Sequence, residues 1–126
     1  MKKMFIPAAT AMAVMLAGAA LAAPVHTGDS ARGKVLTDAK GMTLYTYDKD
    51  ADGKSACTGP CATNWPPLAT SSNAKAEGSY TVISRDDGGK QWAYKGKPLY
   101  TYAKDKSAGD VTGDGAADGA WHVAQP

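Results

Sequence analysis

An internal repeat is the feature of this sequence that most limits its fold. Residues 41–50 read Gly-Met-Thr-Leu-Tyr-Thr-Tyr-Asp-Lys-Asp, and residues 96–105 read Gly-Lys-Pro-Leu-Tyr-Thr-Tyr-Ala-Lys-Asp, so seven of ten positions are identical at an offset of 55. Each copy then passes through a loop rich in Gly and Asp to a tryptophan, Trp65 in the first and Trp121 in the second. Self-similarity at a fixed offset predicts a domain assembled from two related units.

Both tyrosine segments are expected to be β-strands. Their shared Leu-Tyr-Thr-Tyr sequence is rich in aromatic and β-branched residues, which pack well on a pleated surface. Because side chains alternate along a strand, Tyr45 and Tyr47 should share one face, opposite Leu44. Tyr100 and Tyr102 should share a face in the same way. We therefore expect the four tyrosines to form a matched set.

The remaining patterns favour short antiparallel strands and little helix. After the N-terminal segment, no stretch shows apolar residues at helical spacing over ten positions, and Gly or Pro interrupts every long loop. The expected fold is a mainly β, small antiparallel sheet domain built from two sequence repeats. We expect a strand at 35–37, followed by a turn that leads into the first tyrosine strand. We also expect a hairpin of 80–85 and 91–94, which continues through another turn into the second tyrosine strand and so forms a three-strand meander. At most one helical turn is expected, near 61–64.

The N-terminus has the pattern of a cleavable signal peptide. Lys2 and Lys3 precede an apolar stretch that ends in Ala-Leu-Ala, so we expect cleavage after Ala22. The apolar stretch is short for a bilayer span and is interrupted by Pro7 and Gly18, which disfavours a membrane anchor. The sequence therefore predicts export.

The expected mature chain is electrically neutral overall. Lys2 and Lys3 are two of the fourteen Lys and Arg residues, which leaves twelve basic residues against twelve acidic ones. Without a basic run, the chain offers no electrostatic footprint for nucleic acid or anionic lipid. The first cysteine is Cys57, so no lipid anchor is expected near the cut. The expected segments are a signal peptide at 1–22, a flexible lead-in at 23–32, and one two-repeat domain at 33–126, with repeats at about 33–68 and 80–124 and a linker at about 69–79.

The two cysteines, Cys57 and Cys61, lie four residues apart around Gly-Pro. In the oxidising environment outside the cytoplasm, such a pair is expected to form a disulfide. The alternative is a Cu(I) site, because two thiolates with an imidazole or a thioether suit a soft metal, and His26, His122 and Met42 are available as further ligands. The two hypotheses predict different cysteine states, oxidised for the first and reduced with metal for the second.

Two loops carry the beginning of a calcium-binding pattern, with acidic residues at alternate positions and glycine at the sixth. The twelfth position, which should hold a bidentate Glu, is Gly59 in the first loop and Trp121 in the second. Calcium is therefore a weaker alternative to solvated turn residues. The candidate ligands are Asp48, Asp50 and Asp52 in the first loop and Asp110, Thr112, Asp114 and Asp118 in the second.

Aromatic residues are concentrated on or beside the repeated strands. In a domain this small, their large area is expected to form the core, with hydroxyl and indole groups finding partners at its edge. The alternative is an exposed aromatic platform for sugars or for another envelope protein. These residues are Tyr45, Tyr47, Trp65, Trp92, Tyr100, Tyr102 and Trp121.

The sequence gives little support for catalysis. It holds two histidines, His26 and His122, and no Gly-x-Ser-x-Gly turn, phosphate-binding glycine loop or His-Glu-x-x-His zinc motif. A carboxylate pair for glycoside cleavage stays open, because any two of the twelve acids could converge.

The repeated Tyr-x-aromatic-x-x-Asp pattern resembles a family of secreted repeat proteins of unknown function, described as predicted lipoproteins with a Yx(FWY)xxD motif. The Cys-x-Gly-x-Cys and Trp-Pro-Pro-Leu segments of the first copy, and the Gly-x-Trp-His ending of the second, are also similar to that family. The resemblance implies an envelope or secreted location and no defined activity. Many relatives carry a lipidated cysteine after the signal peptide, which this chain lacks. The family motif residues are Tyr45, Tyr47, Asp50, Trp65, Tyr100, Tyr102, Asp105, Trp121 and His122.

We therefore expect an exported, non-enzymatic binding or interaction module that needs no cofactor and works in the periplasm or outside the cell. Its partner would be an envelope protein or a small ligand, rather than nucleic acid or a membrane. The alternative is a periplasmic copper-handling protein that uses Cys57 and Cys61 with His122 or Met42.

Overall fold

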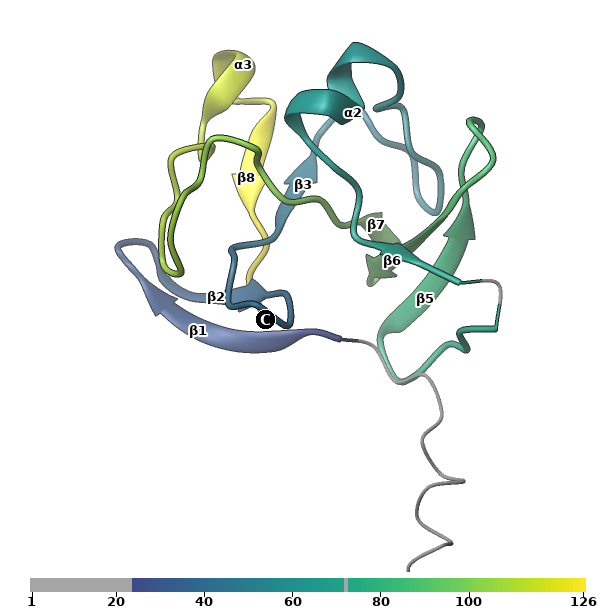
Figure 1. Cartoon of the computed structure of the whole chain (residues 1–126), viewed down its shortest axis with the longest axis horizontal. Coiled ribbons are helices and arrows are strands. Elements are labelled where there is room, and N and C mark those ends of the chain that lie inside the picture. Colours follow the sequence, from purple (N-terminus) through teal and green to yellow (C-terminus); the bar gives the residue numbers. More distant parts are fainter. Residues whose placement is uncertain (1–23, 72) are drawn as a thin grey trace, which may run out of the picture.

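The structure, a computed structural model, describes residues 24–71 and 73–126. The predicted signal peptide at 1–22 lies outside these residues, so its cleavage stays a prediction. Short strands account for most of the regular structure, and two short helices complete it (Figure 1). The elements are β1 (His26–Ser30), β2 (Gly33–Thr37), β3 (Tyr45–Tyr47), α2 (Pro60–Asn64), β4 (Ala69–Thr70), β5 (Tyr80–Ser84), β6 (Lys90–Tyr94), β7 (Lys97–Pro98), α3 (Ala116–Gly119) and β8 (Trp121–Val123).

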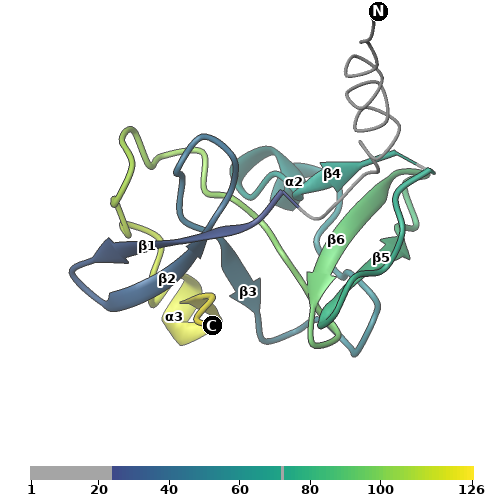
Figure 2. The ribbon, with the colours of Figure 1, turned by 90° about the horizontal axis from the view of Figure 1, so that it is seen from below.

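The strand pairs in the described residues are antiparallel, which confirms the expected mainly β fold. β1 pairs with β2, β3 pairs with β8, and β6 lies between β4 and β5 and also pairs with β7. The β1–β2 and β5–β6 hairpins lie on opposite sides of the molecule, with β3 between them in both views (Figures 1 and 2). Both helices lie at the same end of the molecule in Figure 1.

The two repeats exchange their last strands. In each half of the molecule, three backbone segments form a closed ring of N–H to carbonyl bonds, and one of the three comes from the other repeat. In one ring Leu36 donates to Ala124 (2.8 Å), Ala124 to Leu44 (2.8 Å), and Leu44 to Leu36 (2.9 Å). In the other ring Trp92 donates to Leu68, Leu68 to Leu99, and Leu99 to Trp92 (2.9, 2.9 and 3.0 Å). Each half therefore closes only with a strand contributed by the other repeat.

The flexible lead-in expected at 23–32 is wrong for five of its ten residues. Residues 26–30 form β1, which pairs with β2 along all five residues. The side chains of β1 are mostly exposed, so the segment has no buried periodicity that sequence reasoning could detect. The linker expected at 69–79 is also not wholly linker, because it begins with β4, which pairs with β6.

The second tyrosine segment does not form a regular strand, contrary to expectation. The third strand of the expected meander is the short β7 instead. The physical reason is that neighbouring amides of the segment bond to different parts of the chain, so no ladder can extend along it. Leu99 donates to Trp92, Tyr100 to Tyr45, Thr101 to Pro66 and Ala103 to Asn64.

The core consists of two hydrophobic clusters. As predicted, neighbouring residues of each tyrosine segment pack in different clusters. Leu44 and Leu99 pack in the first cluster, against Trp92. Tyr45 and Tyr100, the next residue in each copy, pack in the second. The predicted alternation is thus confirmed, and the four tyrosines lie together with Trp65 and Trp121. The expected helical turn near 61–64 is also confirmed, as α2, which has proline in its first turn.

Candidate functional site

The two copies of the tyrosine–aspartate motif complete one another. Tyr45 of the first copy donates its hydroxyl to Asp105 Oδ2 of the second at 2.6 Å. Tyr100 of the second copy donates to Asp50 Oδ2 of the first at 2.7 Å. The backbones of the two tyrosines are joined directly, with N–H to carbonyl distances of 2.7 and 3.0 Å. The motif is therefore a reciprocal clasp between repeats, which we call the tyrosine–aspartate clasp.

The second oxygen of each clasp carboxylate holds the loop that follows it. Asp50 Oδ1 accepts the amide of Ala56 at 2.7 Å. Asp105 Oδ1 accepts the amide of Thr112 at 3.0 Å and also the Thr112 hydroxyl. Asp105 is buried and Asp50 is half-buried, and removing a carboxylate from water is costly unless it is hydrogen-bonded. Both oxygens of each carboxylate have donors. Each aspartate therefore fixes its own loop to the tyrosine of the other repeat.

Burial shifts the titration of the clasp. It raises the pKa of Tyr45 and of Tyr100 well above the ordinary value for a phenol, and the neighbouring Asp105 and Asp50 carboxylates add to the rise. Burial also raises the pKa of Asp50 above 3.8, although the Ala56 amide, the Tyr100 hydroxyl and the Arg85 charge oppose that rise. The tyrosines are therefore neutral donors at physiological pH.

A buried arginine joins the clasp to the cysteine loop. The Arg85 side chain is 2 % exposed and is paired with Asp87 at 2.8 Å. Its other hydrogen bonds go to Ser55 Oγ (3.1 Å), Gln91 Oε1 (2.9 Å) and the carbonyl of Cys57 (2.7 Å). The bond to Asp87 raises the pKa of the guanidinium further. A guanidinium with this many acceptors is well satisfied despite its burial.

Four aromatic rings form a continuous stacked column. Tyr47 stacks on Trp121 (centroids 4.1 Å apart), Trp121 on Trp65 (3.8 Å), and Trp65 on Tyr102 (4.0 Å). The interplanar angles are 15°, 2° and 21° in the same order. Trp65 and Trp121 are only 6 % and 2 % exposed, whereas the terminal tyrosines are half-buried. These rings are core, as predicted, rather than an exposed platform.

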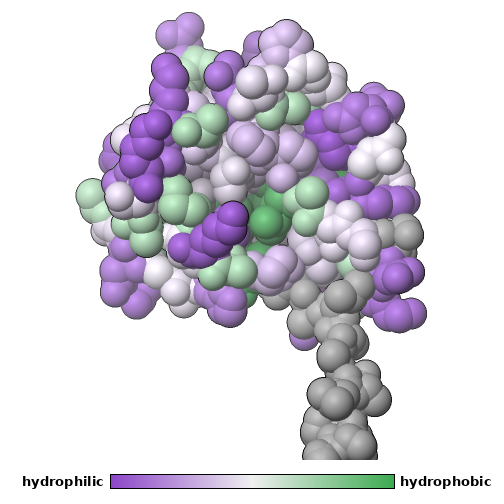
Figure 3. All heavy atoms as spheres, viewed as in Figure 1, coloured by the Kyte–Doolittle hydropathy of each residue, from purple (hydrophilic) through white to green (hydrophobic). Residues whose placement is uncertain are grey.

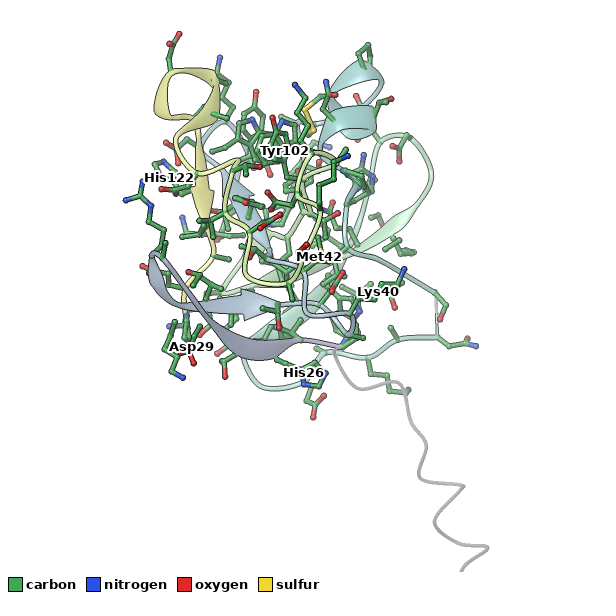
Figure 4. All side chains as sticks on the ribbon, turned by 60° about the vertical axis from the view of Figure 1, so that its left-hand side comes forward. His26, Asp29, Lys40, Met42, Tyr102 and His122 are labelled. Atoms are coloured by element: carbon green, nitrogen blue, oxygen red, sulfur yellow. A yellow bond between two sulfur atoms is a disulfide. The ribbon has the colours of Figure 1, made fainter. Side chains whose placement is uncertain are left out.

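The cysteines form the predicted disulfide. Cys57 and Cys61 are bonded, with their Cα atoms 5.2 Å apart, so neither sulfur is available as a thiolate in this state. The proposed extra copper ligands lie apart from one another in Figure 4, with Met42, His26 and His122 at separate places on the domain. Across the described residues, no group of three His, Cys, Asp or Glu side chains is placed to hold a metal ion.

Five of the seven candidate calcium ligands, which do not include Asp52 and Asp118, have hydrogen-bond or ion-pair partners within the protein. Asp48 pairs with His122 Nε2 at 2.9 Å, and Asp50 belongs to the clasp. Asp110 accepts the amides of residues 106 and 107, whose bonds lower the pKa of its carboxyl. Asp114 pairs with Arg32 at 2.9 Å and accepts the amide of Val123. These bonds give most of the candidate ligands a structural role in their own loops.

An open cleft of about 320 Å³ lies beside the first acidic loop. Tyr47, Asp48 and Asp52 line one part of it, and Lys97 lines another. The loop and the turn before β7 touch there, because a Cβ on Gly96 would lie 2.0 Å from Asp52 Oδ1. Much of the surface facing the reader in Figure 3 is hydrophilic, with a small apolar area near its centre. The cleft is therefore a polar, net acidic hollow with one half-buried aromatic ring.

Sequence reasoning missed several residues that organise this site. Arg85 and Ser55 carried no motif signal, and charged residues are rarely fully buried. Gly113 was not singled out either, although its amide donates to the Tyr45 hydroxyl at 3.2 Å. A Cβ at that position would lie 2.5 Å from the Trp65 ring. The available signal for Gly113 was its place in the Gly- and Asp-rich loop before Trp121.

The described part of the chain contains no helix long and apolar enough to span a membrane. No curated protein and no solved structure matched the sequence. A family described as a secreted repeat of unknown function matches it twice, over residues 26–69 and 81–125. The first match begins at β1, so the first repeat starts earlier than the boundary expected at 33. Since the two matches cover most of the sequence and coincide with the two exchanged units, the chain belongs to this family of secreted repeats of unknown function.

Proposed function

We propose that this protein is an exported, non-enzymatic module that binds a small polar ligand of the cell envelope in the cleft beside its first acidic loop. The observation that carries the proposal is the asymmetry of the two repeats at the surface. Their shared motif residues face inward and hold the repeats together, which leaves little motif chemistry for a ligand. The cleft lies instead where the first repeat's loop meets the turn before β7, and it combines a tyrosine ring with charged side chains.

The charges of the cleft favour a cationic ligand. Asp48, Asp50 and Asp52 line it, against the single cation Lys97. Asp48 is already paired with His122, and Asp50 belongs to the clasp, so Asp52 is the carboxylate that a ligand would meet first. The Tyr47 ring adds a π-face that attracts ammonium groups. A small organic amine therefore fits this hollow better than an anion or a neutral sugar.

The test is an NMR titration of the isotope-labelled protein with three separate probes: putrescine, Ca²⁺ and N-acetylglucosamine trimer. We expect putrescine to cause saturable amide shifts at residues 47–52 and 96–98. Asp52→Asn should weaken them, whereas Asp29→Asn, which changes an exposed acid on β1, should leave them unchanged. Saturable shifts with the sugar alone would contradict the cationic class. The absence of saturable shifts with every probe would overturn the cleft as the binding site.

Native mass spectrometry of protein purified from the periplasm separates this proposal from copper handling. We expect a mass two hydrogens below that of the reduced chain, from the Cys57–Cys61 disulfide, and no acid-labile metal. A reduced chain that carries copper would favour the copper-handling hypothesis, with Cys57 and Cys61 as thiolate ligands, over the binding module. The same spectrum reports whether residues 1–22 have been removed.

A further inference from the structure

The stacked column runs through the core between two half-buried rings. Tyr47 and Tyr102 form its ends, and Trp121 and Trp65 form its middle, with successive centroids no more than 4.1 Å apart. Figure 4 shows Tyr102 within the crowded group of side chains near the two helices. The two indole planes are 2° from parallel at 3.8 Å, so their π-systems overlap face to face. Tryptophan and tyrosine are also the side chains that give up one electron most easily.

Each buried tyrosine of the clasp touches this column at its edge. Tyr45 meets Trp65 edge-on at 5.3 Å, and Tyr100 meets Trp121 edge-on at 5.1 Å. Each of these phenols has a carboxylate oxygen within hydrogen-bond distance, Asp105 at 2.6 Å and Asp50 at 2.7 Å. A phenol that loses an electron becomes strongly acidic and needs a base at this distance to take its proton. Both buried tyrosines have that base in place.

Packing alone explains the stacking but not the choice of proton acceptor. A small domain gains stability by burying large rings, whatever their redox chemistry. A buried carboxylate, in contrast, carries a desolvation cost that a neutral amide acceptor would largely avoid. The same arrangement of ring, phenol and carboxylate occurs twice, once around each tryptophan. Besides holding the loops, the paired carboxylates therefore supply each buried phenol with a proton acceptor that a neutral amide would not supply.

We propose that the aromatic column and the clasp form a one-electron relay that conducts an electron hole from a surface ring to the buried tyrosines. The oxidant is the high-potential haem or copper centre of a partner protein, which accepts one electron from Tyr47 or Tyr102. The hole passes along the column to Trp65 or Trp121. The indole radical cation then takes an electron from Tyr45 or Tyr100, while the phenolic proton moves to Asp105 or Asp50. One neutral indole, one neutral tyrosyl radical and one protonated carboxyl result, so charge and atoms balance.

The test is flash photo-oxidation of the periplasm-purified protein with a ruthenium trisbipyridine complex and an irreversible quencher, followed by transient absorption. In the wild-type chain we expect an indole radical that decays as a tyrosyl radical appears. In Asp50→Asn/Asp105→Asn the tyrosyl radical should form about 100-fold more slowly, because the proton acceptors are lost. Asparagine can still accept the loop amide through its oxygen and donate to the tyrosine oxygen through its nitrogen. Near-ultraviolet circular dichroism will confirm that the variant is folded.

A matched control removes tyrosines outside the column. Tyr80→Phe/Tyr94→Phe deletes the two hydroxyls of a separate ring pair, and it should leave the rate unchanged. A second measurement needs no variant: the wild-type rate should fall in D₂O, because electron and proton leave the phenol together. An equal tyrosyl yield and rate in the Asn variant, with no isotope effect, would overturn the relay. Loss of the tyrosyl signal in the Tyr80/Tyr94 control would also overturn it, by assigning the radical to exposed rings.

Discussion

The clasp makes a quantitative prediction for Tyr45→Phe. The substitution keeps the ring and its contacts but removes the hydroxyl that Asp105 accepts and that itself accepts the Gly113 amide. A hydrogen bond to a charged group contributes about 2 kcal/mol, and a buried amide left without an acceptor costs about 1 kcal/mol or more. We therefore expect Tyr45→Phe to lower the free energy of unfolding by about 3 kcal/mol.

The assay is urea denaturation of the disulfide-intact protein at neutral pH, followed by tryptophan fluorescence. Tyr94→Phe is the control, because Tyr94 is a half-buried tyrosine outside the clasp, and it should change stability by less than about 0.5 kcal/mol. A double-mutant cycle with Asp105→Asn should give a coupling energy of about 1 kcal/mol or more. If Tyr45→Phe costs no more than Tyr94→Phe, or if the coupling vanishes, the clasp does not hold the repeats together.

Three further predictions concern the loops, the titration and the repeat exchange. Gly113→Ala should destabilise the protein by about 1–3 kcal/mol, because the new Cβ would lie 2.5 Å from the Trp65 ring. Gly88→Ala, which changes a turn glycine with open space around it, should cost only its backbone strain. Equal losses of stability in urea denaturation would contradict this reasoning. The pKa of Asp50 in the folded protein lies above 3.8, so the contribution of this carboxyl to stability is present below pH 3.8 and is lost as the pH rises through the folded pKa. The free energy of unfolding of Asp50→Asn should therefore rise relative to that of the wild type between pH 3.8 and neutrality. Parallel stability curves for the two proteins would refute the shift. A protease site inserted between residues 74 and 77 should yield, after cleavage, two fragments that co-elute as one folded species in gel filtration, while separation of the fragments would show that the exchanged strands do not hold the halves together.

The sequence was most informative where local periodicity determines side-chain direction. Alternation along Leu-Tyr-Thr-Tyr correctly assigned Leu44 and Tyr45 to opposite faces, and these faces became two separate core clusters. Cysteine spacing and an exported setting correctly predicted the disulfide. β1 escaped detection because its side chains are mostly exposed, and only its backbone pairing with β2 defines it as a strand.

The exchange between repeats could not be predicted from the repeat itself. Two near-identical segments carry the same information about local structure, and nothing in either copy states which aspartate its tyrosine will reach. That choice depends on contacts 60 residues apart for Tyr45 and Asp105. Arg85 escaped for a different reason, since its burial becomes favourable only when acceptors from two other segments, the cysteine loop and β6, surround it.

The exchanged last strands have a consequence for how this protein is made. β3 pairs with β8, and the associated Asp48–His122 contact joins residues 74 positions apart. Because synthesis proceeds from the N-terminus, the first half of the domain cannot close until the residues of β8 have been made. Folds dominated by such distant contacts form slowly, because the intervening loop must be closed first. If this member of a secreted family is exported as predicted, we expect late closure to keep the polypeptide unfolded until nearly all of it has been synthesised, which is the state that threading through a translocation pore requires.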